Sequence, residues 1–144
     1  MDQLPLLLEQ LVTSPSKNRN TLGVFPQKGI YVFYENECPI YVGRSNRIRE
    51  RLQEHSRPSS THNSATFAFN LAKEDAIKKE IDVNNKARVH LETDSDFSIL
   101  FSEAKKRVSK MSIKVINIDD PIIQTIFEVY VSVKFNTLND FDTH

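Results

Sequence analysis

Cysteine, glycine and net charge are all scarce in this 144-residue chain, and tryptophan is absent. The single cysteine, Cys38, excludes an internal disulfide and fits a reducing compartment. No apolar run approaches the roughly 18 residues that a membrane span needs, and residues 1–5 lack the basic start of a secretory signal. We therefore expect a soluble, cytoplasmic protein with no membrane association.

The charge balance argues mildly against a nucleic-acid ligand. Nineteen basic and nineteen acidic residues cancel, whereas a dedicated DNA-binding domain often has a pI above about 9. The distribution is uneven, because residues 44–57 carry five arginines against Glu50 and Glu54. Such a basic patch on a neutral body can hold a phosphate backbone without very tight non-specific binding.

The order of apolar patterns predicts an α+β fold with a small, mostly antiparallel sheet. Strands are predicted over 30–34, 40–43 and 113–118, the first two joined by a loop over 35–39. Helices are predicted over 4–12, 45–55, 63–80, 97–108 and from Pro121 to about 135, with a loop or irregular strand over 81–96.

The helix predicted after the hairpin carries a basic row. At about 100° per residue, its four members fall within roughly 80° of one another, beside the apolar Ile48 and Leu52. The members are Arg44, Arg47, Arg51 and His55. Arginine can make two fixed hydrogen bonds to phosphate oxygens. A solvated face with pairs to neighbouring glutamates is the alternative interpretation.

Glu128 is the only charged residue in the segment 121–133, which is otherwise apolar nearly all round. Such a helix should be buried, and an uncompensated buried carboxylate is costly. The polar residues on its face are Gln124, Thr125 and Ser132. A divalent cation with water would satisfy this stripe. A structural ion pair to one of the arginines, or a polar edge at the surface, explains Glu128 equally well.

Tyr31 and Tyr41 lie one on each arm of the predicted hairpin, where tyrosines are usually core residues with a wet hydroxyl. Two of the three glycines, Gly29 and Gly43, flank the same hairpin. Glycine at these positions indicates a tight turn or a close backbone approach to a ligand. No glycine-rich phosphate loop and no zinc signature are present in the sequence.

Together these residues resemble the GIY-YIG nuclease superfamily. The resemblance covers about residues 29–144 and rests on the following segments: Gly29-Ile30-Tyr31, Tyr41-Val42-Gly43, Arg44-Ser45, Arg51 to His55, Glu128-Val129-Tyr130, Asn139-Asp140-Phe141 and His144. It implies a three-stranded sheet flanked by helices. It also divides the chain into an N-terminal helical extension, residues 1–28, and a nuclease domain, residues 29–144.

The resemblance implies metal-dependent endonuclease activity on DNA, double-stranded or branched. Glu128 would hold a single Mg²⁺ or Mn²⁺ ion at the scissile phosphate. Arg51 would neutralise charge on phosphorus, and Tyr41 would orient water or phosphate. Tyr31 or His55 would be the general base, a choice the sequence leaves open.

Asn139 would support the metal or phosphate side of the site, with Asn136 as its competitor. Arg44 and Arg47 would bind the nucleic acid. An inactive scaffold that binds DNA or a protein, and an RNA nuclease, remain alternatives. Oligomeric state and partner proteins are left open.

Overall fold

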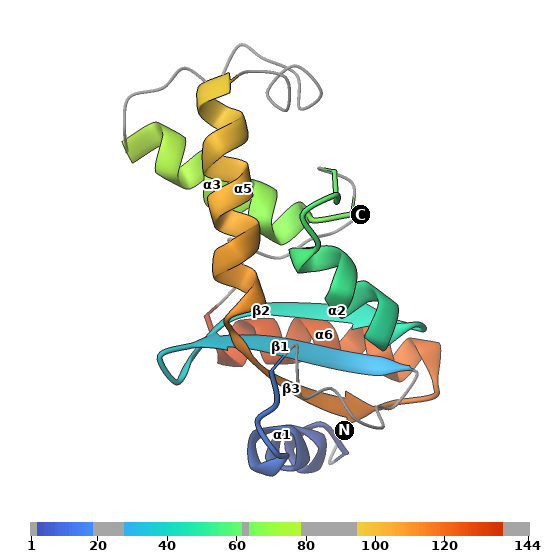
Figure 1. Cartoon of the computed structure of the whole chain (residues 1–144). Coiled ribbons are helices and arrows are strands. Elements are labelled where there is room, and N and C mark those ends of the chain that lie inside the picture. The colour runs from blue at the N-terminus through green and yellow to red at the C-terminus, as the bar shows by residue number, and fades with distance from the viewer. Residues whose placement is uncertain (1–2, 19–27, 62–63, 79–94, 137–144) are drawn as a thin grey trace. The chain divides into compact units, whose positions relative to one another are not determined.

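The computed structural model describes residues 3–18, 28–61, 64–78 and 95–136. The chain divides into two compact units, Met1–Leu52 with Met111–His144, and Gln53–Lys110. Figure 1 labels their helices and strands. Within the described ranges, no helix has both the length and the apolar character needed to cross a bilayer.

The first unit is built on a three-stranded sheet in the order β2-β1-β3. The strands are β1 (Gly29–Glu35), β2 (Cys38–Ser45) and β3 (Ser112–Asn117). Both pairings are antiparallel, and an isolated bridge from Lys17 to Ile113 continues the far edge of β3. This arrangement, with helices around it, confirms the predicted α+β class.

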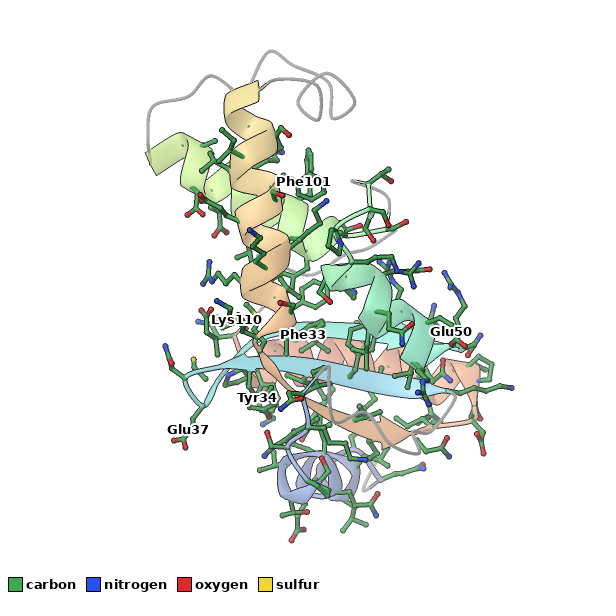
Figure 2. All side chains as sticks on the ribbon, in the orientation of Figure 1. Phe33, Tyr34, Glu37, Glu50, Phe101 and Lys110 are labelled. Atoms are coloured by element: carbon green, nitrogen blue, oxygen red, sulfur yellow. The ribbon has the colours of Figure 1, made fainter. Side chains whose placement is uncertain are left out.

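The β1–β2 turn is tighter than the predicted five-residue loop. Only Asn36 and Glu37 connect the strands, and both have positive φ, 53° and 66°, as a type I′ hairpin turn requires. Glu37 marks the tip of the hairpin in Figure 2. Pro39 pairs with Tyr34, and proline is tolerated there because β2 is an edge strand.

One face of the sheet forms the main core of this unit. Its residues from β1 and β2 are Ile30, Val32, Tyr34 and Val42. Helix α6 (Pro121–Lys134) contributes Phe127 and Val131, and helix α1 (Gln3–Thr13) contributes Leu11. Because side chains alternate along a strand, Tyr31, Phe33 and Tyr41 lie on the opposite face. Figure 2 shows Phe33 and Tyr34 on opposite sides of β1.

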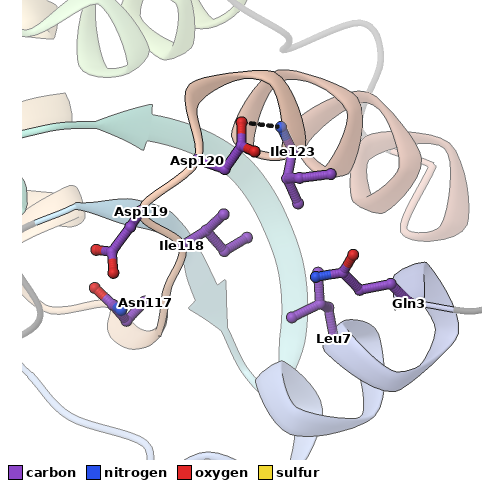
Figure 3. A pocket seen from close by; sticks show the side chains of 7 residues that line it. All are labelled: Gln3, Leu7, Asn117, Ile118, Asp119, Asp120 and Ile123. Carbon is purple, nitrogen blue, oxygen red and sulfur yellow. Dashed lines mark hydrogen bonds between the residues drawn. The ribbon is translucent and has the colours of Figure 1, made fainter.

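The start of α6 follows the predicted signals. Asp120 is the N-cap, and its Oδ1 accepts hydrogen bonds from the backbone N–H groups of Ile122 and Ile123, at 2.8 and 3.4 Å. The second of these bonds is drawn in Figure 3. Pro121 occupies the first turn, where its missing N–H costs nothing. The helix ends at Lys134 with Phe135 as its C-cap, and Asn136 follows with φ 57°.

The second unit contains helices α3 (Thr66–Lys78) and α5 (Ser95–Ser109), which pack against each other. Phe69 contacts Phe97 and Phe101 edge-on, with ring centroids 5.2 and 5.5 Å apart. Lys105 is buried, and its Nζ donates to the carbonyl oxygens of Pro58 and Ser60, at 2.7 and 3.0 Å. Both helices were predicted; the segment 81–96 lies largely outside the described residues.

Candidate active site

The two motif tyrosines meet on one face of the sheet. Tyr31 and Tyr41 are 1% and 2% exposed, and their ring centroids lie 6.5 Å apart. Phe33 lies between them in sequence, with centroids 5.8 Å from Tyr31 and 6.1 Å from Tyr41. The tyrosines thus form one aromatic cluster, which brings together residues that the sequence placed on separate arms.

Gly43 makes room for the ring of Tyr31. The two residues pair directly across β1 and β2. A Cβ at Gly43 would lie 2.2 Å from Cζ, 2.4 Å from the hydroxyl oxygen and 2.6 Å from Cε2 of Tyr31. These distances are far below ordinary contact. The phenol therefore rests on the Gly43 backbone, and its hydroxyl lies beside Gly43, the residue before Arg44 in β2.

Gly29 is required for a different reason. Its φ is +149°, and a Cβ there would lie 1.9 Å from the carbonyl oxygen of Ile116 on β3. Both the backbone conformation and the close approach of two strands exclude a larger residue. Packing within the protein therefore accounts for both glycines of the hairpin.

Arg44 and Arg47 do not belong to the helix that the sequence predicted for them. Helix α2 spans Ile48–Ser56, whereas Arg44 lies in β2. Ser45 ends the strand, and its Oγ accepts from the backbone N–H of Arg47 at 2.9 Å. The predicted row of four is therefore divided between strand, turn and helix, and only Arg51 and His55 share a helix.

The side chain of Arg44 is anchored on α6. Its Nη1 donates to Thr125 Oγ at 2.8 Å, across 81 residues of sequence. Gln124 makes a similar connection, because its Nε2 donates to Ile118 O at 2.5 Å and to Asn46 Oδ1 at 3.4 Å. Gln124 and Thr125 were recognised in the sequence only as polar residues near Glu128, and nothing local to either segment identifies their partners.

Arg51 and His55 lie one turn apart on α2, as predicted. Arg51 is half-buried, next to the buried Ile48 and Leu52. His55 is fully buried, and it belongs to the second compact unit while Arg51 belongs to the first. Arg51 is therefore partly shielded from water, and a charge in such a place acts more strongly on an anion than it does in bulk solvent.

Glu128 is half-buried, not buried as the sequence predicted. The expected burial of α6 on all sides is wrong, because four of its aliphatic residues are 38–68% exposed. Those residues are Ile122, Ile126, Val129 and Val133. The helix has one buried face, on Phe127 and Val131, and the half-buried Glu128 lies between the buried Gln124 and Ser132, one turn from each. The sequence pattern overestimated burial because aliphatic residues also occupy the outer side.

The polar stripe beside Glu128 is satisfied by the protein itself. Ser132 Oγ donates to the main-chain oxygen of Glu128 at 2.7 Å. Thr125 Oγ accepts from Arg44 and donates to Pro121 O at 2.9 Å. These hydroxyls therefore do not require the cation that the sequence suggested for the stripe, and the case for a metal rests on the Glu128 carboxylate.

A single carboxylate fits a hard divalent cation. Mg²⁺ commonly takes one or two protein carboxylates and keeps several waters. Among the described residues, no group of three or more His, Cys, Asp and Glu side chains could hold a metal ion. Asn136 is exposed at the end of α6, and Asn139 lies outside the described residues.

A surface pocket of about 230 Å³ lies elsewhere on the first unit. Its lining residues, shown in Figure 3, are Gln3, Leu7, Asn117, Ile118, Asp119, Asp120 and Ile123. They come from α1, the end of β3 and the start of α6. None of them is a predicted site residue, and the Asp120 carboxylate is already engaged as the N-cap. This pocket is therefore separate from the tyrosine cluster.

Comparison with known protein families identifies this fold and motif set. Residues 27–107 match the family model described as the GIY-YIG catalytic domain. The match includes both tyrosine motifs, Arg51 and His55, and it ends before Glu128. Neither the curated proteins nor the solved structures gave a match. Since the matched region spans more than half of the chain, the protein belongs to the GIY-YIG family of nuclease catalytic domains.

Proposed function

We propose that this protein is a divalent-metal-dependent endonuclease that hydrolyses phosphodiester bonds in DNA by a one-metal mechanism. The observation that carries the proposal is the seating of Tyr31 on Gly43. This contact holds a buried phenol beside Gly43 in β2, and the chain continues from there through Arg44 to Arg51. Membership of a nuclease family supports the reaction class.

Each side chain has a role that its surroundings support. Tyr31 is the candidate for the base that takes a proton from the attacking water, with His55 as the alternative. Tyr41, in contact with the same aromatic cluster, would orient that water or the phosphate. Arg51 would stabilise the negative charge that develops on the phosphate oxygens as the new P–O bond forms and the old one breaks.

Two further groups complete the site. The Glu128 carboxylate would hold one Mg²⁺ or Mn²⁺ ion, which acts as a Lewis acid on the phosphate when bound. Arg44 would bind the nucleic-acid backbone from a position set by Thr125, and Arg47 would do so from the following turn. Asn139 is proposed to support the metal or phosphate side of the site. The nuclease domain is proposed to comprise residues 29–144.

The test is cleavage of supercoiled plasmid and of branched DNA by the purified chain, with Mg²⁺, Mn²⁺ or EDTA. Glu128→Gln should abolish cutting, whereas Glu103→Gln, an exposed glutamate on α5, should leave it unchanged. Arg51→Lys should lower the rate by roughly a hundredfold or more, the cost of one lost charge-stabilising donor. Arg49→Lys, exposed on the same helix, is its control.

Three outcomes would contradict the proposal. Salt-sensitive DNA binding without metal-dependent cutting would indicate an inactive scaffold. Cutting of matched RNA but not DNA would indicate an RNA nuclease. Cleavage that survives in Glu128→Gln at the normal rate would show that this carboxylate does not hold the metal.

A further inference from the structure

The outer side of α6 carries a continuous row of exposed aliphatic residues. Ile122, Ile126, Val129 and Val133 are 68%, 38%, 45% and 56% exposed. At about 100° per residue they fall within about 60° of one another. Phe127 and Val131, on the other side of the helix, are fully buried. We name these four residues the α6 stripe. A contiguous exposed row of this kind is typical of an interaction surface.

The α6 stripe is symmetric about its own midpoint. Ile122 and Val133 lie equally far from the point between residues 127 and 128, and so do Ile126 and Val129. If a second α6 packs antiparallel on the first, Ile122 of one copy faces Val133 of the other, and Ile126 faces Val129. A two-fold interface requires such self-complementarity, because the same patch serves both partners.

The charges at the two ends of α6 favour the same antiparallel arrangement. Asp119 and Asp120 are exposed at its start, and Lys134 is exposed in its last turn. Antiparallel packing brings the acids at the start of one α6 to the end of the other that carries Lys134, whose Nζ lies over the Tyr130 ring 5.5 Å from its centroid, and it opposes the two helix dipoles. Parallel packing would place like charges together. An anionic membrane is a poorer partner, because the exposed acids at the start of α6 would be repelled by it.

We propose that the α6 stripe is the interface of a reversible homodimer formed by antiparallel packing of α6 from two copies of this chain. The stripe consists of four residues over about 16 Å of helix at 1.5 Å per residue, whereas a stable interface uses roughly 20–30 residues and about 800 Å² on each side. The association is therefore weak and depends on concentration. Glu128 lies about 130° around the helix from the stripe centre, so dimer formation leaves that carboxylate uncovered.

Sedimentation velocity of the full chain, without DNA, tests the proposal from micromolar to millimolar concentration. The wild-type chain should shift from monomer to dimer over this range. The double variant Ile126→Asp with Val129→Asp should remain monomeric, with an unchanged far-ultraviolet circular dichroism spectrum. Ile99→Asp is the matched control, because Ile99 is an isoleucine of α5 that is 59% exposed. It should dimerise like the wild type.

Charge reversal tests the antiparallel geometry separately. Asp119→Lys and Lys134→Glu should each weaken the dimer, and their combination should restore it, because the pair is then reversed but still complementary. A wild-type chain that is monomeric throughout would overturn the proposal. Equal loss of dimer in Ile99→Asp, or binding to anionic vesicles without self-association, would also overturn it. None of these measurements depends on nuclease activity.

Discussion

Gly43→Ala places a methyl group where the ring of Tyr31 lies. The added Cβ would be 2.2–2.6 Å from three atoms of the phenol, whereas carbon atoms in ordinary contact are about 3.5–4.0 Å apart. The ring must therefore move by more than about 1 Å. Little space is available, because Tyr31 is 1% exposed and its neighbours Phe33 and Tyr41 pack around it.

The expected cost follows from two opposing effects. Overpacking of a filled core costs about 1–3 kcal/mol. Replacing glycine by alanine within a strand returns about 0.5–1 kcal/mol, because the unfolded chain loses conformational freedom. We therefore expect Gly43→Ala to lower the free energy of unfolding by about 1–2 kcal/mol. Under the proposed function, we also expect the cleavage rate to fall by more than the loss of folded protein accounts for, because the Tyr31 hydroxyl is displaced.

Urea unfolding and near-ultraviolet circular dichroism measure these effects. The chain has four tyrosines and no tryptophan, so the near-ultraviolet signal reports directly on the tyrosine environment. The control is a double-mutant cycle. In a Tyr31→Leu background, which removes the ring, Gly43→Ala should be neutral or stabilising. In a Tyr31→Phe background it should remain destabilising, because Cζ and Cε2 are still present.

The reasoning would be refuted if Gly43→Ala cost the same in the wild-type and Tyr31→Leu backgrounds. A zero coupling energy would mean that the glycine serves the backbone alone. An unchanged near-ultraviolet spectrum in Gly43→Ala would refute it independently, because the ring would then have stayed in place.

Three further outcomes are expected. Lys105→Met should lower the free energy of unfolding by about 2 kcal/mol, because the buried carbonyl of Ser60 and the partly buried carbonyl of Pro58 lose the donor Nζ. Lys106→Met, on an exposed lysine, should change it little in the same urea titration. Asp120→Ala should cost about 1 kcal/mol through loss of the N-cap, whereas Asp119→Ala should cost less. Burial raises the pKa of Tyr34, so its contribution to stability is fully present below about pH 10, the unfolded value, and is lost as the pH rises through the folded pKa. Tyr34→Phe should flatten the alkaline decline in a series of urea titrations, and an identical decline in both proteins would contradict this assignment.

The local elements were largely predictable, and the failures have specific causes. The loop over 35–39 was overestimated because positive φ at Asn36 and Glu37 closes the hairpin in two residues. Arg44 was assigned to a helix because arginine spacing alone cannot distinguish a strand end from a first turn. The exposure of α6 was missed because a helix made mostly of aliphatic residues has the same composition whether one side or all sides are buried.

The sequence by itself determined the α+β class, the order of the motifs and the position of most helices and strands, because caps, turns and periodicity act between neighbours in the chain. Only the tertiary structure decided that the ring of Tyr31 occupies the space where Gly43 lacks a side chain, and that Arg44 hydrogen-bonds to Thr125. It also decided that one apolar side of α6 is exposed. Each of these depends on contacts, or on their absence, between segments far apart in sequence. Local pattern carries no information about which surface a neighbouring segment covers.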